Sequence, residues 1–232
     1  MHKLKCLVFA ILLGAAAGAD AAGAQGMDAA QRALVERYVA AVAAQDRVGL
    51  RKLYHPASLA CINAGNRDYF DFIFTKELSY GAALRGSYAI KRFAPLGADA
   101  ATAATMGGLI PNPVPPTHLF QIDARWNDNR PAPTIHSVTI VRAVAESGGA
   151  WFIVLGCPSD KAVALFREKR AADERQQARV KQLADALGDP LLAEIRSLLA
   201  QNRRLDAINR YRSAANVDLT TAVQVIDILA DR

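Results

Sequence analysis

The chain has 232 residues, a formal net charge of +6 at neutral pH, 52% hydrophobic residues and only 7% aromatic residues. This length allows one domain with an appendage or two small domains. Basic and acidic residues are interleaved from residue 159 to the end, which is typical of a solvated helical surface and excludes the concentrated basic face that nucleic-acid binding needs.

The start of the chain has the order of parts of a secretory signal peptide. Lys3 and Lys5 precede the apolar run CLVFAILLG, and two AGA triplets follow. An uncleaved membrane anchor is the weaker interpretation, because the run falls short of the ~20 residues that a spanning helix needs. We expect residues 1–24 to be a cleaved leader, with the mature chain starting at Asp20 or Gln25, and a periplasmic or secreted location.

Three helices are predicted before any strand. The first is amphipathic and begins behind a capping Asp28. The second is capped by Asp46 and ends before Pro56, because a residue that precedes proline is pushed out of the helical region. The third covers 67–80 and stops at Gly81. Its expected face consists of Tyr69, Phe72, Ile73 and Lys76.

A sheet is predicted next. GSYAIKRF alternates in strand fashion, and three more strands follow as THLFQIDARW, TIHSVTIVRAVAE and AWFIVLGC, the last two joined by SGG as a hairpin. Between the first strand and the others, residues 94–116 are rich in glycine, proline and alanine and have no sustained period, so we expect a long mobile loop or a lid. Together the strands form a curved antiparallel sheet.

The order of these elements resembles the cone-shaped superfamily of nuclear transport factor 2, ketosteroid isomerase and SnoaL-like proteins. The resemblance rests on the two-helix opening AAVAAQDRVGLRKLYHP and on the last strand with Gly149, Trp151 and Ile153. It implies an α+β domain over 25–158, in which three N-terminal helices pack on a curved sheet around an apolar pocket. Some members of the superfamily are enzymes, and many only bind or scaffold.

Strand alternation predicts which side chains line such a pocket. A histidine in an apolar pocket can shuttle a proton, and an arginine there can clamp a carboxylate. The alternative is that the histidines are core or rim residues and that the arginine extends to the sheet edge. The candidate pocket residues are Tyr69, His118, Phe120, Trp126, His136, Arg142 and Trp151.

No catalytic constellation is evident. Isomerases of this superfamily need a carboxylate base and a phenol that converge on one carbonyl, but Asp123 is predicted on the polar side of its strand. Serine-hydrolase, phosphate-loop and zinc-protease motifs are lacking, and two histidines without a third ligand do not predict a metal site. We therefore assign no catalytic residue, cofactor or metal.

Two cysteines, Cys61 and Cys157, remain once the leader is removed. An oxidising compartment permits a disulfide between them, and two buried unpaired thiols are the alternative.

The rest of the chain is predicted to be helical. Residues 159–188 form a spacer helix with a polar middle, which Gly188-Asp189-Pro190 ends, and 189–232 form a module of three short helices. Leu205 to Leu229 resembles the helical hairpin of the C-terminal domain of the bacterial ribosomal stalk protein. Asn216 and Asp218 stand where that family has glycines, and asparagine or aspartate can enter the left-handed conformation that such a turn needs. The resemblance implies docking to another helix or protein, whereas the family's basic face is missing.

These patterns favour an exported binding or interaction protein of the cell envelope. The cone binds a small apolar ligand or a partner, and the helical tail contacts a protein or a second copy, without nucleic-acid binding or stable membrane insertion. The alternative is an isomerase- or dehydratase-type enzyme that uses the cone cavity.

Overall fold

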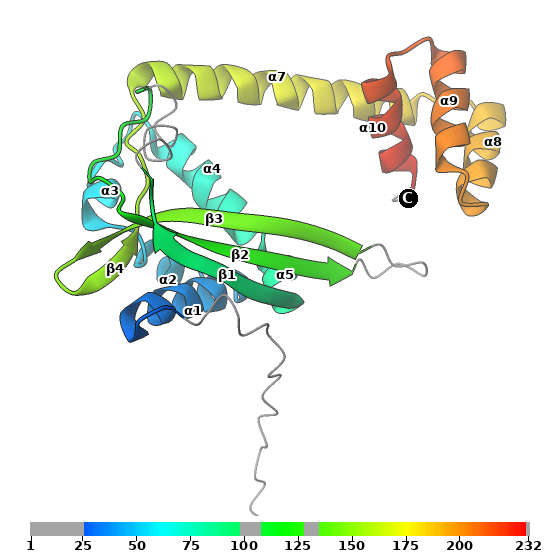
Figure 1. The fold of residues 1–232 in the computed structure, drawn as a ribbon. Coiled ribbons are helices and arrows are strands. Elements are labelled where there is room, and N and C mark those ends of the chain that lie inside the picture. Colours follow the sequence, from blue (N-terminus) through cyan, green and yellow to red (C-terminus); the bar gives the residue numbers. More distant parts are fainter. Residues whose placement is uncertain (1–25, 98–107, 128–134, 231–232) are drawn as a thin grey trace, which may run out of the picture. The chain divides into compact units, whose positions relative to one another are not determined.

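The structure is a computed structural model that describes residues 26–97, 108–127 and 135–230. The protein is a mixed α+β protein, and its chain divides into two compact units, Met1–Ala162 and Val163–Arg232 (Figure 1). We call them the N-terminal and the C-terminal unit and describe each by itself.

Helices come first in the N-terminal unit, and two of them were not predicted. The short helices α3 and α5 accompany the three expected ones. Pro56, expected only to end a helix, also starts α3, because the His55 side chain caps it by accepting a hydrogen bond from the backbone N–H of Ala57 at 3.1 Å. Gly81, expected as a stop, is the first residue of α5. Among the described residues before the sheet, the helices are α1 (Ala29–Ala43), α2 (Arg47–Arg51), α3 (Pro56–Ala60), α4 (Arg67–Leu78) and α5 (Gly81–Arg85).

Both predicted caps are present. The Asp28 carboxylate accepts from the backbone N–H of Gln31 at 2.7 Å, and the Gln31 side chain accepts from the backbone of Asp28 at 3.1 Å, which is a capping box. Asp46 accepts from the N–H of Gly49 at 2.9 Å and so starts α2. These bonds satisfy donors that the first turn of a helix leaves free.

The sheet is antiparallel, with four strands in the order β1-β2-β3-β4. A two-residue turn joins β3 and β4, and its residues Gly148 and Gly149 have φ of 61° and 79°, as a hairpin turn of the mirror-image type requires. The predicted hairpin is therefore confirmed. The strands are β1 (Ser87–Pro95), β2 (His118–Asn127), β3 (Ile135–Ser147) and β4 (Ala150–Ile153).

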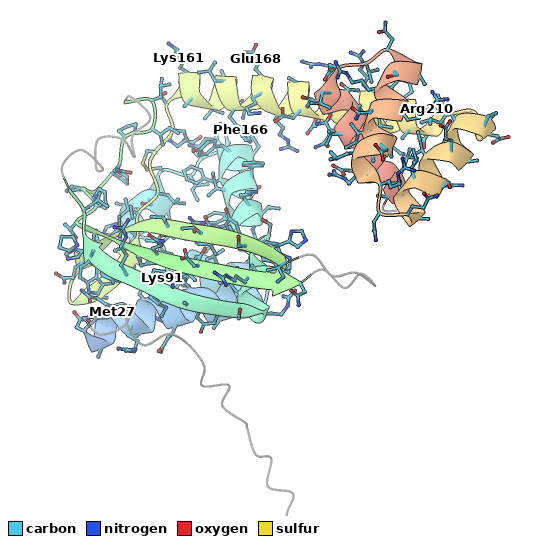
Figure 2. All side chains as sticks on the ribbon, turned by 45° about the vertical axis from the view of Figure 1, so that its right-hand side comes forward. Met27, Lys91, Lys161, Phe166, Glu168 and Arg210 are labelled. Carbon is cyan, nitrogen blue, oxygen red and sulfur yellow. A yellow bond between two sulfur atoms is a disulfide. The ribbon has the colours of Figure 1, made fainter. Side chains whose placement is uncertain are left out.

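One face of the sheet forms the core of the N-terminal unit with the helices. Along β2, Phe120, Ile122 and Ala124 are fully buried and alternate with more exposed residues, as strand geometry requires. Lys91 of β1 is exposed (Figure 2). Ile140 of β3 and Ile153 of β4 belong to the same core, and Tyr54 joins it from the segment between α2 and α3. The helices contribute large core side chains that include Leu34, Tyr38, Leu50, Phe70 and Phe74.

Helices alone form the C-terminal unit. Its core includes Val180 and Ala184 of the long helix α7, so the last turns of that helix, expected to be spacer, pack with the module. The remaining core residues are Ile195, Ala207, Ile208, Tyr211, Ala222, Val225, Ile226 and Leu229. The helices are α7 (Asp160–Asp185), α8 (Asp189–Ala200), α9 (Arg204–Ala215) and α10 (Leu219–Ala230).

The turn between α9 and α10 has the predicted geometry at Asn216 but not at Asp218, which is not among the described residues with a positive φ. Asn216 ends α9 in the left-handed conformation, with φ of 51°. The Asp218 carboxylate then accepts from the backbone N–H of Thr221 at 2.9 Å and from its hydroxyl at 2.7 Å, which starts α10. None of the described helices is both long and apolar enough to cross a membrane. The expected leader lies outside the described residues.

Candidate functional site

The predicted pocket residues of the sheet lie at separate positions along it. Trp126 and His136 pair at one end of β2 and β3, with stacked rings 5.2 Å apart. His118 lies eight residues earlier on β2, which is about 26 Å at about 3.3 Å per residue. The two histidines are therefore too far apart to act together on one small substrate.

His118 belongs to an aromatic cluster at the opposite end of the sheet. Its ring lies 4.8 Å from the ring of Trp151 and 5.8 Å from that of Phe93, centroid to centroid. Its Nδ1 atom is 3.1 Å from the hydroxyl of Thr117. Tyr69 is on α4, half-buried, next to Phe70. The aromatic residues thus pack in pairs and clusters.

Arg142 lies on β3, opposite Phe120 in the register of β2 and β3. Its guanidinium meets the carboxylate of Glu77 on α4: Nε donates at 2.9 Å and Nη2 at 2.7 Å. The Tyr38 hydroxyl of α1 donates to the same carboxylate at 2.6 Å. Glu77 is 6% exposed, so this is a buried ion pair with a phenol attached. We call Tyr38, Glu77 and Arg142 the buried polar cluster.

Burial and the neighbouring groups together fix the charge states of Tyr38 and Arg142. Burial raises the pKa of Tyr38 well above its usual value, and the neighbouring Glu77 adds to this effect while Arg142 opposes it. Burial alone would lower the pKa of Arg142, but the interactions with Tyr38 and Glu77 outweigh it, and the net shift is upward. Tyr38 therefore stays a neutral donor and Arg142 stays a cation.

Tyr54 lies next to the buried polar cluster but does not join its hydrogen bonds. Its ring packs edge-on against Phe74 at 5.3 Å, and its buried hydroxyl has no hydrogen-bond partner among the described residues. Burial, followed by the charge of Glu77, raises the pKa of Tyr54.

Asp123 lies on the outer face of the sheet, as predicted. Its carboxylate accepts a hydrogen bond from the Thr139 hydroxyl at 2.8 Å, which lowers the pKa of Asp123.

Glu77 was missed by the sequence analysis. The buried residues of α4 are Phe70, Phe74 and Glu77, whereas Phe72, placed on the expected face, is 45% exposed. Phenylalanine, tyrosine and isoleucine occur on several sides of this helix, so its period does not single out one face. Glu77 is recognised as a buried, paired residue only once its ion-pair partner Arg142 on β3 is known.

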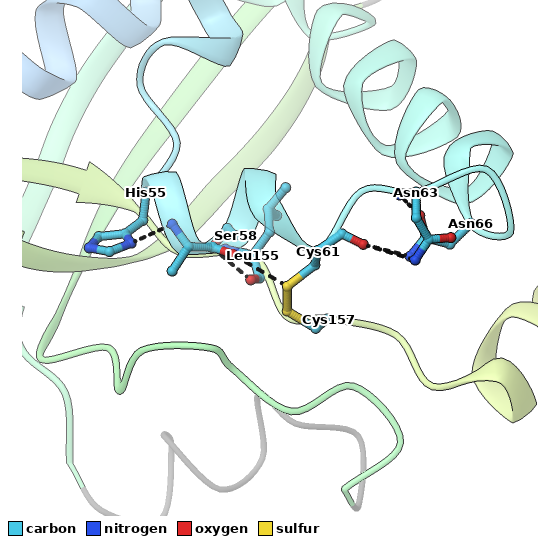
Figure 3. Close-up of a disulfide and its surroundings, with 8 residues drawn as sticks. His55, Ser58, Cys61, Asn63, Asn66, Leu155 and Cys157 are labelled. Atoms are coloured by element: carbon cyan, nitrogen blue, oxygen red, sulfur yellow. Dashed lines mark hydrogen bonds between the residues drawn. A yellow bond between two sulfur atoms is a disulfide. The ribbon is translucent and has the colours of Figure 1, made fainter.

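Cys61 and Cys157 form the predicted disulfide, with Cα atoms 5.6 Å apart (Figure 3). The bond joins the end of α3 to the segment after β4. Beside it, the Ser58 hydroxyl donates to the carbonyl of Leu155 at 2.9 Å and accepts from its N–H at 3.1 Å (Figure 3). The helix α3 is thus fixed to the chain after β4 by one covalent and two polar links.

The expected loop over 94–116 is partly tied down. The N–H of Cys157 donates to the carbonyl of Pro111 at 2.7 Å, and the N–H of Ser159 donates to that of Leu109 at 3.0 Å. Residues 98–107, the other part of the expected lid, lie outside the described residues.

Two cavities lie in the N-terminal unit away from the buried polar cluster. One, of about 380 Å³, is bounded by α2, α3 and α4 and is lined by Arg51, Leu59, Ile62, Arg67, Phe70, Asp71 and Phe74. The other, of about 400 Å³, lies at the Trp126 end of the sheet and is lined by Gly86, Ser87, Arg125, Trp126, Asn127 and Ile135. Glu77 and Arg142 line neither of them.

Within the part of the chain that the structure describes, histidine, cysteine and carboxylate side chains form no group of three that could hold a metal ion. No protein-family model matches the chain, and no curated protein or solved structure matches it either. The two family resemblances therefore stay predictions.

Proposed function

We propose that this is an exported binding protein of the cell envelope. Its N-terminal unit, a cone-like domain in this proposal, recognises a small ligand or a partner, and its C-terminal unit makes protein contacts. The observation that carries the proposal is the internal pairing of Glu77, since this buried carboxylate faces Tyr38 and Arg142 rather than open space.

A general base must reach the proton that it abstracts. The Glu77 carboxylate already accepts from Tyr38 and twice from Arg142, so its acceptor capacity is directed at the protein itself. Breaking a buried pair by removing one partner leaves an uncompensated charge. The buried polar cluster therefore suits a structural role, which is to hold α1 and α4 against β3.

An isomerase-type enzyme is the second candidate function. It is favoured by one observation: the buried Tyr54 hydroxyl lies near Glu77 and has no hydrogen-bond partner within the described part of the chain. A phenol and a carboxylate in an apolar interior are the groups that such isomerases use.

Turnover measurements distinguish a binding protein from an isomerase-type enzyme. Wild type, Glu77→Gln and a His118→Ala, His136→Ala double variant are assayed with enol-isomerisation, dehydration and ester substrates, and their folding is checked by thermal melting. We expect no turnover above the blank for any of them. A rate that is lost in a folded variant would establish an enzyme and overturn the proposal.

Export is supported by the leader pattern and by the Cys61–Cys157 disulfide. Sequencing the N-terminus of the protein recovered from the periplasm or medium tests it. We expect a start at Asp20 or Gln25, and a chain that keeps Met1 would contradict export with cleavage.

A further inference from the structure

Residues 108–116, which we call the strap, lead into β2 and lie against the chain that follows β4. We call that chain, residues 155–159, the post-β4 segment. Four of the nine residues of the strap are proline, which has no backbone N–H to donate. The strap therefore depends largely on hydrogen bonds that its carbonyl groups accept.

In the described chain, two backbone hydrogen bonds attach the strap, and both donors belong to the post-β4 segment. The N–H of Cys157 donates to the carbonyl of Pro111 at 2.7 Å, and the N–H of Ser159 donates to that of Leu109 at 3.0 Å. Both bonds are lost if the post-β4 segment moves away.

The two segments also touch closely between these bonds. A Cβ atom at Gly156 would lie 2.5 Å from the Ile110 side chain and 2.8 Å from the Ile110 carbonyl oxygen, so a larger residue does not fit at this position. The strap thus occupies a defined place on the post-β4 segment.

The disulfide holds the post-β4 segment in turn. Cys157, whose N–H bonds to the strap, is joined through its sulfur to Cys61 at the end of α3 (Figure 3). One residue therefore carries both the covalent link to α3 and the shorter hydrogen bond to the strap. The position of the strap depends on the redox state of this cysteine.

Other contacts remain when the disulfide opens. The Ser58 hydroxyl bonds to both the carbonyl and the N–H of Leu155, so the first residue of the post-β4 segment stays attached to α3. The Cys61 sulfur lies 3.3 Å from the carbonyl oxygen of Ala57, which can accept from the thiol that reduction creates. Reduction therefore frees the end of the post-β4 segment rather than the whole of it.

We infer that the Cys61–Cys157 disulfide is a redox switch: its reduction by a dithiol releases the strap, while the N-terminal unit stays folded. Both cysteines are half-buried, so neither is closed off from a reductant by complete burial. The inference goes beyond the proposed function, because it concerns the control of the unit and not what the unit binds.

The reaction is thiol–disulfide exchange. One thiolate of the dithiol attacks a sulfur of the disulfide and forms a mixed disulfide, and the other cysteine leaves as a thiolate that takes up a proton. The second thiol of the reductant then displaces the remaining cysteine. Two electrons and two protons thus pass to Cys61 and Cys157, and the dithiol becomes a disulfide.

Native reduction of the full mature chain with dithiothreitol tests the inference. Alkylation and intact mass should show two labelled thiols after reduction, and circular dichroism and tryptophan fluorescence should remain those of a folded protein. Oxidised dithiothreitol should restore the starting state.

Amide exchange followed by NMR locates the change. The N–H groups of Cys157 and Ser159 should exchange at least about tenfold faster after reduction, because their acceptors on the strap are lost. The N–H groups of Thr117 and Val154, which donate to carbonyls of β3 at 2.9 Å, should stay protected by at least about a hundredfold over an unfolded chain.

The control is the double variant Cys61→Ser with Cys157→Ser. Its amides at positions 157 and 159 should exchange as fast as in the reduced wild type, and dithiothreitol should change nothing in it.

Three results would overturn the inference. Native protein that dithiothreitol does not reduce would show that the bond is closed to exchange, and slow exchange at Cys157 and Ser159 after reduction would show that the strap is held independently. Loss of protection at Thr117 and Val154 as well would show a bond that only keeps the unit folded. None of these results affects the turnover assays or the test of export.

Discussion

The two units of the chain place their charged groups differently. In the N-terminal unit an ion pair lies inside the core, and Glu77 and Arg142 are separated by 65 residues in the sequence. In the C-terminal unit the core is mainly apolar, and its ion pairs lie outside: Arg210 of α9 (Figure 2) donates to Glu194 of α8 at 2.8 Å with both side chains nearly half exposed. A buried ion pair can form in only one relative placement of its two side chains, whereas an exposed ion pair can form in several.

The same contrast holds for the links between distant segments. The N-terminal unit joins residues 96 and 97 positions apart, through the disulfide and through Ser58 with Leu155. The helices α8, α9 and α10 of the C-terminal unit pack mainly with their neighbours in sequence, and α8 also contacts α10. Contacts distant in sequence require long loops to close during folding, which costs entropy and slows folding. We therefore expect different kinds of substitution to destabilise the two units.

The largest effect is expected from a charge in the C-terminal core. Ile208 is 3% exposed, so Ile208→Asp buries an unpaired carboxylate in a small core and should unfold this unit. Circular dichroism should show lost helicity, while tryptophan fluorescence, whose only sources are Trp126 and Trp151, should report an unchanged N-terminal unit. The control Leu205→Asp on the same helix is 75% exposed and should stay within about 0.5 kcal/mol of wild type. Full helicity in Ile208→Asp would contradict the assigned core.

Removal of the disulfide should act on the other unit alone. Cys61→Ser with Cys157→Ser releases the constraint on the unfolded chain between them, which is about 4.7 kcal/mol in the chain-entropy model for a separation of 96 residues. The fluorescence transition in urea should move to lower concentration, and the helical signal of the C-terminal unit should not follow it. Alkylation of the native protein without reductant is the control, and labelling at both cysteines would show that the bond is absent.

Breaking the buried ion pair is expected to cost about 3 kcal/mol, because Arg142→Met leaves the Glu77 carboxylate buried without its cation. The double variant Glu77→Leu with Arg142→Met removes both charges and should recover most of the loss. Urea unfolding followed by tryptophan fluorescence measures both. Arg210→Gln, the exposed counterpart in the C-terminal unit, should unfold as wild type does. An equal loss in the single and the double variant would mean that packing, and not the charge, matters here.

A smaller difference in the free energy of unfolding is expected between variants of two buried tyrosines, Tyr38 and Tyr54. Tyr38→Phe removes a donor from Glu77 and should lower the free energy of unfolding by about 1–2 kcal/mol. Tyr54→Phe removes a hydroxyl that has no partner among the described residues, so it should leave stability unchanged or raise it. Side-by-side urea titrations of these isosteric variants measure the difference. If Tyr54→Phe loses as much as Tyr38→Phe, the Tyr54 hydroxyl has a partner.

Local signals in the sequence predicted local structure well. Asp28 and Asp46 cap their helices, the two glycines make the β3–β4 turn, and Asn216 adopts the left-handed conformation. Each of these depends on residues within a few positions of one another. Strand alternation likewise identified the inward face of β2, where Phe120 and Ile122 are fully buried.

Contacts between distant elements could not be predicted in the same way. Alternation assigns His118 and Trp126 to one face but does not bring them together, because their positions along β2 set the distance. In the sequence, Glu77 cannot be distinguished from a surface residue, because its partner Arg142 is 65 positions away. Helix α3 is five residues long, too short for a period to show. The cavity between α2, α3 and α4 depends on three such placements at once, so it has no signal in the sequence.

The disulfide also has a topological consequence. The chain between Cys61 and Cys157 forms a closed ring that contains all four strands of the sheet. A protease that cuts one peptide bond anywhere in this ring opens it without separating the molecule into two pieces. A single cut therefore leaves both flanking parts of the chain covalently joined until a reductant releases them.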